Sequence, residues 1–194
     1  MGGFVLLLWS MNFLAAALLG FQKLPNKLLA HSIRLGLVLT LLGSSIGGLM
    51  TAPTSAQVAG FKTAAPSVIG AHTVGGVDGG PGLPFLGWST AHGDLRVPHF
   101  VGLHALQMLP LLFLLLNILG ARFGWSEPQR LRLLWTGAAS YLGLIGLLLW
   151  QALRGQSVVA PDRLTVGVFA GLLAVAGLAA VMTLRSPGAS RRAL

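Results

Sequence analysis

Apolar positions along this chain do not alternate with polar ones but collect into long runs that are nearly free of charge. The runs extend over about residues 3–21, 28–50, 100–119, 131–153 and 164–184. A helix needs about 20 apolar residues to cross the hydrocarbon core of a bilayer. The pattern therefore predicts an all-α protein, a polytopic transmembrane helix bundle with about five spans that forms a single membrane domain over residues 1–194.

Composition supports the same class of protein. Only 9% of the residues are charged and 54% are hydrophobic, whereas a soluble domain has about 25% charged residues. The net charge of +9 would suggest nucleic-acid binding in a soluble protein, but here the basic residues flank the apolar runs, as membrane insertion places them. We therefore expect the lipid bilayer as the partner and no nucleic acid. The absence of cysteine excludes disulfides and thiolate metal sites.

The distribution of Lys and Arg predicts the orientation. Basic residues gather in the first connection, in the third connection and in the C-terminal tail: Lys23, Lys27, Arg122, Arg130, Arg132, Arg185, Arg191 and Arg192. In a five-span protein these three segments all lie on the same side of the membrane. Short segments rich in Lys and Arg stay in the cytoplasm. We expect a multi-pass protein of the bacterial cytoplasmic (inner) membrane, with the N-terminus and the loop 51–98 outside and the C-terminus in the cytoplasm.

The long loop 51–98 is rich in glycine, but it also carries large apolar side chains, among them Val77, Phe85 and Trp88. A disordered linker would be more polar, and ordered loops of this length are usually functional. Burying each large side chain would contribute about 1.5 to 3 kcal/mol. We therefore expect residues 70–98 to form an ordered extracytoplasmic cap that packs on the outer ends of the second and third spans and buries these side chains.

Polar residues continue from this loop into the third apolar run. His104 and Gln107 are three positions apart and share a helical face, and polar groups inside a span usually point into the bundle or a wet cavity. The alternative is that both simply hydrogen-bond a neighbouring helix. Pro110 is expected to kink this helix. We predict a ligand or partner pocket in residues 70–107, formed by Asp94, Arg96, His99, His104 and Gln107, with Asp78 and Trp88 nearby.

The histidines of this region allow a second interpretation. His72, His99 and His104 could bind a transition metal together with a carboxylate, since imidazole and carboxylate ligands suit Zn, Cu or Fe. None of these histidines has the spacing of a helical metal motif, and a haem would need ligands from two helices. No Ser, His and Asp arrangement is visible, so we assign no catalytic residue.

The stretch HTVGGVDGGPGLPFLGWSTAHGDLRVPHFVGLHALQ, from His72 to Gln107, carries HTVG, DGGPGLP, GWST, GDLR and HFxGLHALQ motifs. It resembles a family of uncharacterised bacterial multi-pass membrane proteins, and the likeness extends back to GSSIGGLM at Gly43–Met50. The resemblance implies a bacterial membrane location and a functional centre in residues 72–107. Members of that family are longer at the N-terminus, with additional spans, so the resemblance also implies helices that this chain lacks.

Two functions remain open at this point. The first is a non-enzymatic accessory or binding subunit that contacts a partner, including other membrane subunits or the helices absent from this chain, through its cap and polar pocket. The alternative is a membrane-embedded metal- or haem-dependent redox protein or enzyme that uses the histidines of the outer side. The scarcity of carboxylates favours the first, since the chain has only four Asp and Glu.

Overall fold

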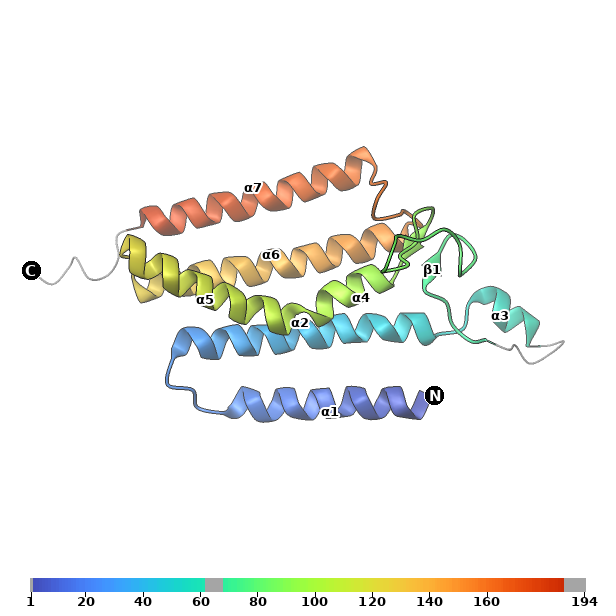
Figure 1. Cartoon of the computed structure of the whole chain (residues 1–194), viewed down its shortest axis with the longest axis horizontal. Helices are drawn as coiled ribbons and strands as arrows, with labels where there is room; N and C mark the ends of the chain where they lie inside the picture. Colours follow the sequence, from blue (N-terminus) through green and yellow to red (C-terminus); the bar gives the residue numbers. More distant parts are fainter. Residues whose placement is uncertain (1, 62–67, 187–194) are drawn as a thin grey trace, which may run out of the picture. The chain divides into compact units, whose positions relative to one another are not determined.

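The computed structural model describes residues 2–61 and 68–186, and most of this chain is helical (Figure 1). The helices are α1 (Gly2–Phe21), α2 (Lys27–Thr51), α3 (Ser55–Gly60), α4 (Arg96–Leu103), α5 (Ala105–Phe123), α6 (Glu127–Leu153) and α7 (Arg163–Arg185). Two short strands, β1 (Thr73–Val74) and β2 (Gly93–Asp94), pair in antiparallel fashion. Part of the expected loop 51–98, residues 62–67, and the end of the basic tail lie outside the described residues.

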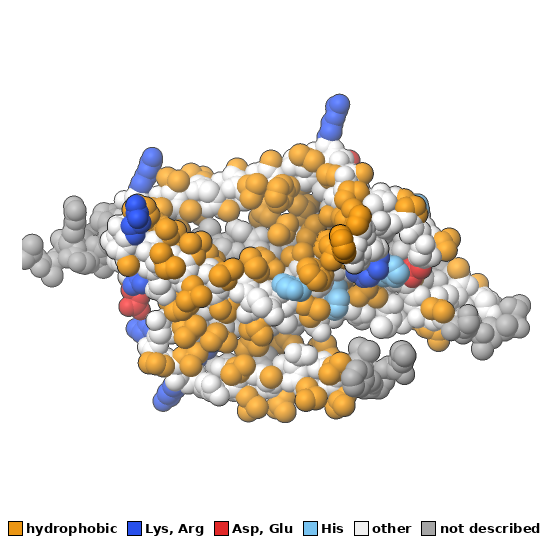
Figure 2. All heavy atoms as spheres, in the orientation of Figure 1, with side chains coloured by type: hydrophobic (Ala, Val, Ile, Leu, Met, Phe, Trp, Pro, Cys, Tyr) orange, Lys and Arg blue, Asp and Glu red, His pale blue; other side chains and the backbone are white. Residues whose placement is uncertain are grey.

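Several helices are suited to a bilayer. Among the described residues, four helical segments are long and apolar enough to cross a membrane: Lys27–Gly60, Ala105–Phe123, Glu127–Leu153 and Arg163–Arg185. Hydrophobic side chains cover these helices on the face shown in Figure 2, and many large ones are exposed, such as Leu114, Trp135 and Leu173. A soluble monomer rarely exposes so much apolar surface. A fifth crossing by α1, whose apolar stretch Leu7–Gly20 is shorter, stays a prediction.

The described chain divides into two compact units. Unit 1 comprises Met1–Leu41, Leu103–Leu144 and Phe169–Leu194, and unit 2 comprises Leu42–Gly102 and Ile145–Val168. Helices α2, α6 and α7 contribute residues to both units. The expectation of one membrane domain over the whole chain stays a prediction.

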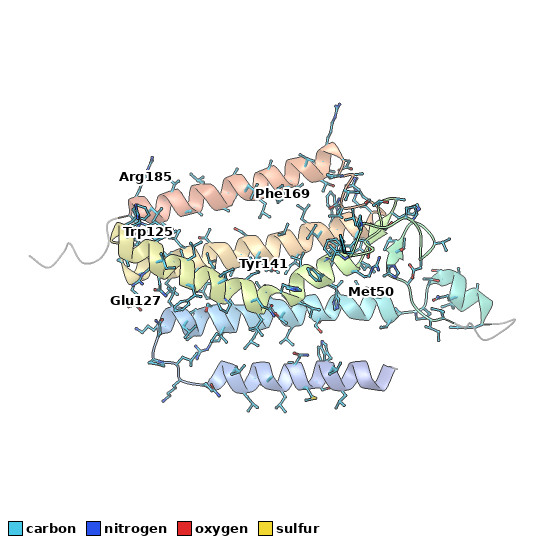
Figure 3. All side chains as sticks on the ribbon, viewed as in Figure 1. Met50, Trp125, Glu127, Tyr141, Phe169 and Arg185 are labelled. Atoms are coloured by element: carbon cyan, nitrogen blue, oxygen red, sulfur yellow. The ribbon has the colours of Figure 1, made fainter. Side chains whose placement is uncertain are left out.

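In unit 1, the three segments that carry the basic residues share one end. The side-chain amide of Gln129, at the start of α6, donates hydrogen bonds to the carbonyl oxygens of Thr183, Leu184 and Ser186 at the end of α7. The first connection and the start of α2 contribute residues 25–28 to a cavity that Asn117 and Arg130 also line. Figure 3 shows Trp125, Glu127 and Arg185 at this same end. The first connection, the start of α6 and the end of α7 thus lie at one end of unit 1, and the assignment of this end to the cytoplasm stays a prediction.

The third predicted span, 100–119, is displaced by a helix break. Residue His104 separates α4 from α5, and α5 continues to Phe123. The hydroxyl of Thr40 in α2 donates to the carbonyl of Leu103 at 3.3 Å and accepts from the N–H of Leu106 at 3.1 Å. These are backbone groups that the ends of two helices leave unpaired. The chain thus has a helix break at His104, where Thr40 supplies the hydrogen bonds, and α5 stays helical through Pro110, so the expected kink at Pro110 stays a prediction.

Small residues allow α2 to approach its neighbours closely. In unit 1, a Cβ on Gly36 would lie 3.1 Å from the Cα of Leu106, and in unit 2 a Cβ on Gly102 would lie 2.4 Å from the Cα of Gly43. Such contacts between backbones are the usual means of helix association in lipid, where the hydrophobic effect gives no drive. The glycines of α2 thus bring it close to α4 in unit 2 and to α5 in unit 1.

The helix break generates a first prediction. Replacing Thr40 with Val preserves the shape of the side chain but removes the hydroxyl, so we expect the free energy of unfolding in detergent micelles to fall by about 1 to 2 kcal/mol. The matched control is Thr136→Val, because the hydroxyl of Thr136 donates to the carbonyl of Arg132 within its own helix. Thr40→Ser should retain most of the stability. An equal loss in the Thr40 and Thr136 variants would contradict a special role for Thr40.

Candidate functional site

Of the expected cap, residues 70–98, the last three residues belong to α4, which begins at Arg96, so from here on the cap means the loop of residues 70–95 in unit 2. Thr73 pairs with Asp94 and Val74 with Gly93 in the two-stranded sheet, and an isolated bridge joins Gly82 to Ser89. The cap is joined to the end of α2, since the N–H of Ala71 donates to the carbonyl of Met50 at 3.0 Å. The cap therefore consists of two turns closed by β pairing, and the strands of this pairing were not predicted from the sequence.

Asp94 is the central polar group of the cap. Its side chain is buried, and it accepts hydrogen bonds from the N–H groups of Ser89 (2.8 Å) and Arg96 (3.0 Å) and from the guanidinium of Arg96 (2.7 Å to Nη2). Burial alone would raise the pKa of Asp94, but the hydrogen bonds from Arg96 and Ser89 outweigh it and hold the pKa below its ordinary value of 3.8. The carboxylate is therefore ionised at neutral pH and stabilises the cap most in that form.

Arg96 extends this network to the second turn of the cap, residues 82–89. Its Nη2 also donates to the carbonyl of Gly87 at 2.6 Å. Within the turn, the N–H of Leu86 donates to the carbonyl of Pro84 at 2.8 Å, and Phe85 between them has φ +65°. A hydrogen bond over three residues with a positive central φ defines a γ-turn of the rare, strained kind. We call Phe85 and Leu86 the tip.

Contacts with the connection between α6 and α7 anchor the cap on its other side. The hydroxyl of Ser157 donates to the carbonyl of Ser89 at 2.8 Å, and the amide of Gln151 donates to the carbonyl of Ser157 at 2.8 Å. A Cβ on Gly93 would lie 2.0 Å from the carbonyl oxygen of Ala152, so only glycine fits there. The sequence prediction placed the cap on the second and third spans and missed this contact with α6, because nothing in the sequence marks Gln151 or Ser157 as partners of Ser89.

Asp78 closes the first turn of the cap. Its carboxylate accepts hydrogen bonds from the N–H groups of His72 (3.2 Å) and Thr73 (2.7 Å), and the Nδ1 of His72 lies 3.1 Å from it. Burial opposes ionisation here too, but the hydrogen bonds from Thr73 and His72 lower the pKa of Asp78. Asp78 and His72 thus stabilise the first turn of the cap, and their side chains contact each other.

His99 joins α4 to α2 within unit 2. Its Nδ1 lies 2.8 Å from the carbonyl oxygen of Gly43, which can only accept, so the Nδ1 carries the proton and donates. The ring also covers Gly47, where a Cβ would lie 3.1 Å from the Cε1 of His99. The candidate pocket residue His99 therefore acts as a helix-packing side chain that fills the space glycine leaves.

The remaining pocket candidates do not lie as predicted. His104 and Gln107 belong to unit 1, and both are exposed instead of turned into the bundle. The turn between them is helical, since the N–H groups of Gln107 and Met108 both donate to the carbonyl of His104, so the two residues share a face as expected, but that face is exposed. In unit 2, the space beside Asp94 and Gln151 does not admit a water-sized sphere. Asp94 and Arg96 thus form a packed structural network, not the wall of a ligand cavity.

The structure does not gather the proposed metal ligands. Over residues 2–61 and 68–186, no group of three His, Asp or Glu side chains is placed to hold a metal ion. His72 is paired with Asp78 and His99 with Gly43, whereas His104 lies in unit 1. The predicted metal site of His72, His99 and His104 is therefore not formed. Each of these histidines lies on a different segment of the chain and has its own surroundings.

The apolar side chains of the cap divide into two groups. Trp88 is half-buried and packs edge-on against Phe100 of α4, with 5.5 Å between ring centroids. Val77 is 85% exposed and Phe85 is 108% exposed, and the exposed Leu86 adjoins Phe85. The expectation that Val77 and Phe85 are buried is wrong. The cap is held together by hydrogen bonds to Asp94 and Asp78, so it does not need to bury Val77 and Phe85.

The buried carboxylate generates a second prediction. Asp94→Asn leaves Arg96 without its counter-charge, so we expect unfolding of the cap to become easier by about 3 kcal/mol, the low end for breaking a buried pair since Arg96 is partly exposed. Hydrogen exchange at the Ser89 amide should accelerate more than a hundredfold. The control is Asp162→Asn, which removes the exposed partner of Arg154 and should leave Ser89 protected. Unchanged exchange at Ser89 in Asp94→Asn would refute this role of Asp94.

Comparison with known proteins assigns no family to the chain. No protein-family model, curated protein or solved structure matches it. The resemblance of residues 72–107 to bacterial multi-pass membrane proteins therefore stays an expectation, and the function has to be argued from the geometry of the cap.

Proposed function

We propose that this chain is a non-enzymatic binding subunit of a bacterial cytoplasmic membrane, which uses the tip of its extracytoplasmic cap to dock on another membrane protein. The observation that carries the proposal is the conformation of Phe85. A large aromatic side chain is fully exposed on a residue with φ +65°. Strain of this kind costs about 1 to 3 kcal/mol and persists where the surrounding structure fixes it, often for function.

The tip is fixed from two directions. Arg96 holds the carbonyl of Gly87, and the N–H of Gly87 donates to the carbonyl of Leu83 at 2.8 Å. Ser89, which follows the turn, is held by both Asp94 and Ser157. An anchor held this rigidly loses little conformational entropy on binding, which raises affinity for a shaped protein pocket. Partition into fluid lipid would gain nothing from a fixed backbone, so we favour a protein partner.

Aromatic anchors of this type dominate the energetics of protein interfaces. The alternative of a metal or redox enzyme receives no comparable support from the arrangement of the histidines. Asp78 and Asp94 of the cap and Arg96 at the start of α4 form hydrogen bonds that hold the two turns of the cap. Under this proposal the predicted functional centre in residues 72–107 is retained, but it works by display of an apolar anchor and not through a polar pocket.

The orientation of the chain is part of the proposal. With five spans, the cap and the connection near Val159 face outward, and the basic end of unit 1 faces the cytoplasm. Because the chain has no cysteine, single cysteines can be introduced at Val77, Val159, Lys23 and Phe123 and treated with an impermeant maleimide in intact cells. We expect labelling at residues 77 and 159 only. Labelling at residues 23 and 123 instead would contradict the proposed orientation. A cysteine in place of Gly3 should also be labelled, and its protection would contradict a fifth crossing by α1.

The docking proposal has a direct test. A photoreactive amino acid at Leu86 of the full chain, irradiated in native membranes, should give one discrete protein adduct. Phe85→Ser should reduce that adduct at least tenfold, since an interface anchor contributes about 2 kcal/mol or more. Phe123→Ser is the matched control, because Phe123 is also exposed but lies at the end of α5 in unit 1. Adducts with lipid alone, or a protein adduct that is indifferent to Phe85→Ser, would contradict the proposal.

A further inference from the structure

A cavity of about 460 Å³ lies at the basic end of unit 1 and shares no residue with the cap. Small-ligand sites in proteins have volumes of about 300 to 1,000 Å³. The lining comes from three places in the chain, namely the first connection and the start of α2, the last turns of α5, and the first turn of α6. These residues are Pro25, Asn26, Lys27, Leu28, Asn117, Glu127 and Arg130.

Arg130 is held in a defined position on this cavity. Its Nη1 donates to the side-chain oxygen of Asn117 at 2.6 Å. Its aliphatic stem lies against Gly120, where a Cβ would come within 2.5 Å of Cδ. The Nε is buried without a hydrogen-bond partner among the described residues. A guanidinium fixed in this way keeps further N–H donors for a ligand, since it has five in all.

The cations at the cavity are not fully balanced by the carboxylates of the described residues. Among the residues that the structure describes, neither Lys27 nor Arg130 forms an ion pair with a carboxylate. Glu127 also lines the cavity, but it compensates only one of the two cations. The side chain of Asn26 accepts from the N–H of Leu29 and so begins α2 here, and the positive end of that helix adds to the field. An anion of one to two charges would complete this site.

We infer that this cavity binds a phosphate group between Lys27 and Arg130. Phosphate suits the site because a guanidinium recognises its oxygens through paired hydrogen bonds while an ammonium contributes a point charge. The group can belong to the headgroup of an anionic phospholipid or to a free phosphate in solution. Both sources present the same oxygens to the same two side chains, and they are separated by experiment.

The test uses the full chain in micelles and counts bound phosphatidylglycerol by native mass spectrometry, with phosphatidylcholine as the neutral lipid and inorganic phosphate as a competitor. Arg130→Gln and Lys27→Gln should each weaken phosphatidylglycerol retention about tenfold or more, because each removes a charged hydrogen bond. Arg132→Gln and Lys23→Gln are matched controls. They remove the same charge from the same helix and the same connection without touching the cavity, and they should change retention less than twofold.

The outcomes are distinct. Selective retention of phosphatidylglycerol that depends on Lys27 and Arg130 assigns the site to a lipid headgroup. Equal retention of both lipids, with stabilisation of the chain by millimolar inorganic phosphate that the same two variants abolish, assigns it to free phosphate. If all four variants weaken retention equally, the effect is diffuse surface charge and the inference is wrong. It is also wrong if neither probe binds. Should Arg130→Gln fail to fold, Lys27→Gln decides alone, since that side chain is exposed.

Discussion

The cap depends on one buried carboxylate. Asp94 binds the backbone on both sides of itself, at Ser89 and at Arg96, and through the guanidinium of Arg96 it also reaches Gly87. It thereby connects the entrance of α4, the short sheet and the turn that displays Phe85. A buried ionised group is costly unless every lone pair is used, and here the surrounding donors use them. The glycine-rich segment can be ordered because this interaction replaces the apolar core that it lacks.

A second constraint acts within the helices. Backbone N–H and C=O groups at membrane depth need partners inside the protein, because lipid offers none. The break at His104 meets this requirement through a single hydroxyl, that of Thr40, which serves as donor to one helix end and acceptor from the next. In unit 2, the ring N–H of His99 finds its own partner in the carbonyl of Gly43, a residue inside α2. The polar side chain of His99, which the sequence suggested as a ligand-binding group, thus forms a hydrogen bond between two helices instead.

These hydrogen bonds between distant parts of the chain limit how much of the structure the sequence could predict. The long helices follow from the runs of apolar residues, and the shared end of the basic segments follows from the positions of Lys and Arg, since the cost of placing apolar groups in water or charged groups in lipid is large and local. The break at His104 could not be predicted, because it depends on Thr40, which lies more than sixty residues earlier. The exposure of Phe85 escaped prediction for a related reason. Hydropathy predicts burial, whereas a strained turn fixed by Asp94 and Arg96 overrides it.

The distribution of carboxylates favours binding over catalysis. The chain has four acidic residues, and three of them are committed to backbone N–H groups at turns or helix starts: Asp78, Asp94 and Asp162. The hydrogen bond from Arg154 strongly lowers the pKa of Asp162, while hydrogen bonds outweigh burial to lower the pKa values of Asp78 and Asp94. A catalytic acid or base works best when its pKa lies near the working pH. The pKa values of Asp78, Asp94 and Asp162 are shifted away from neutral pH, as suits permanent anions that hold loops in place.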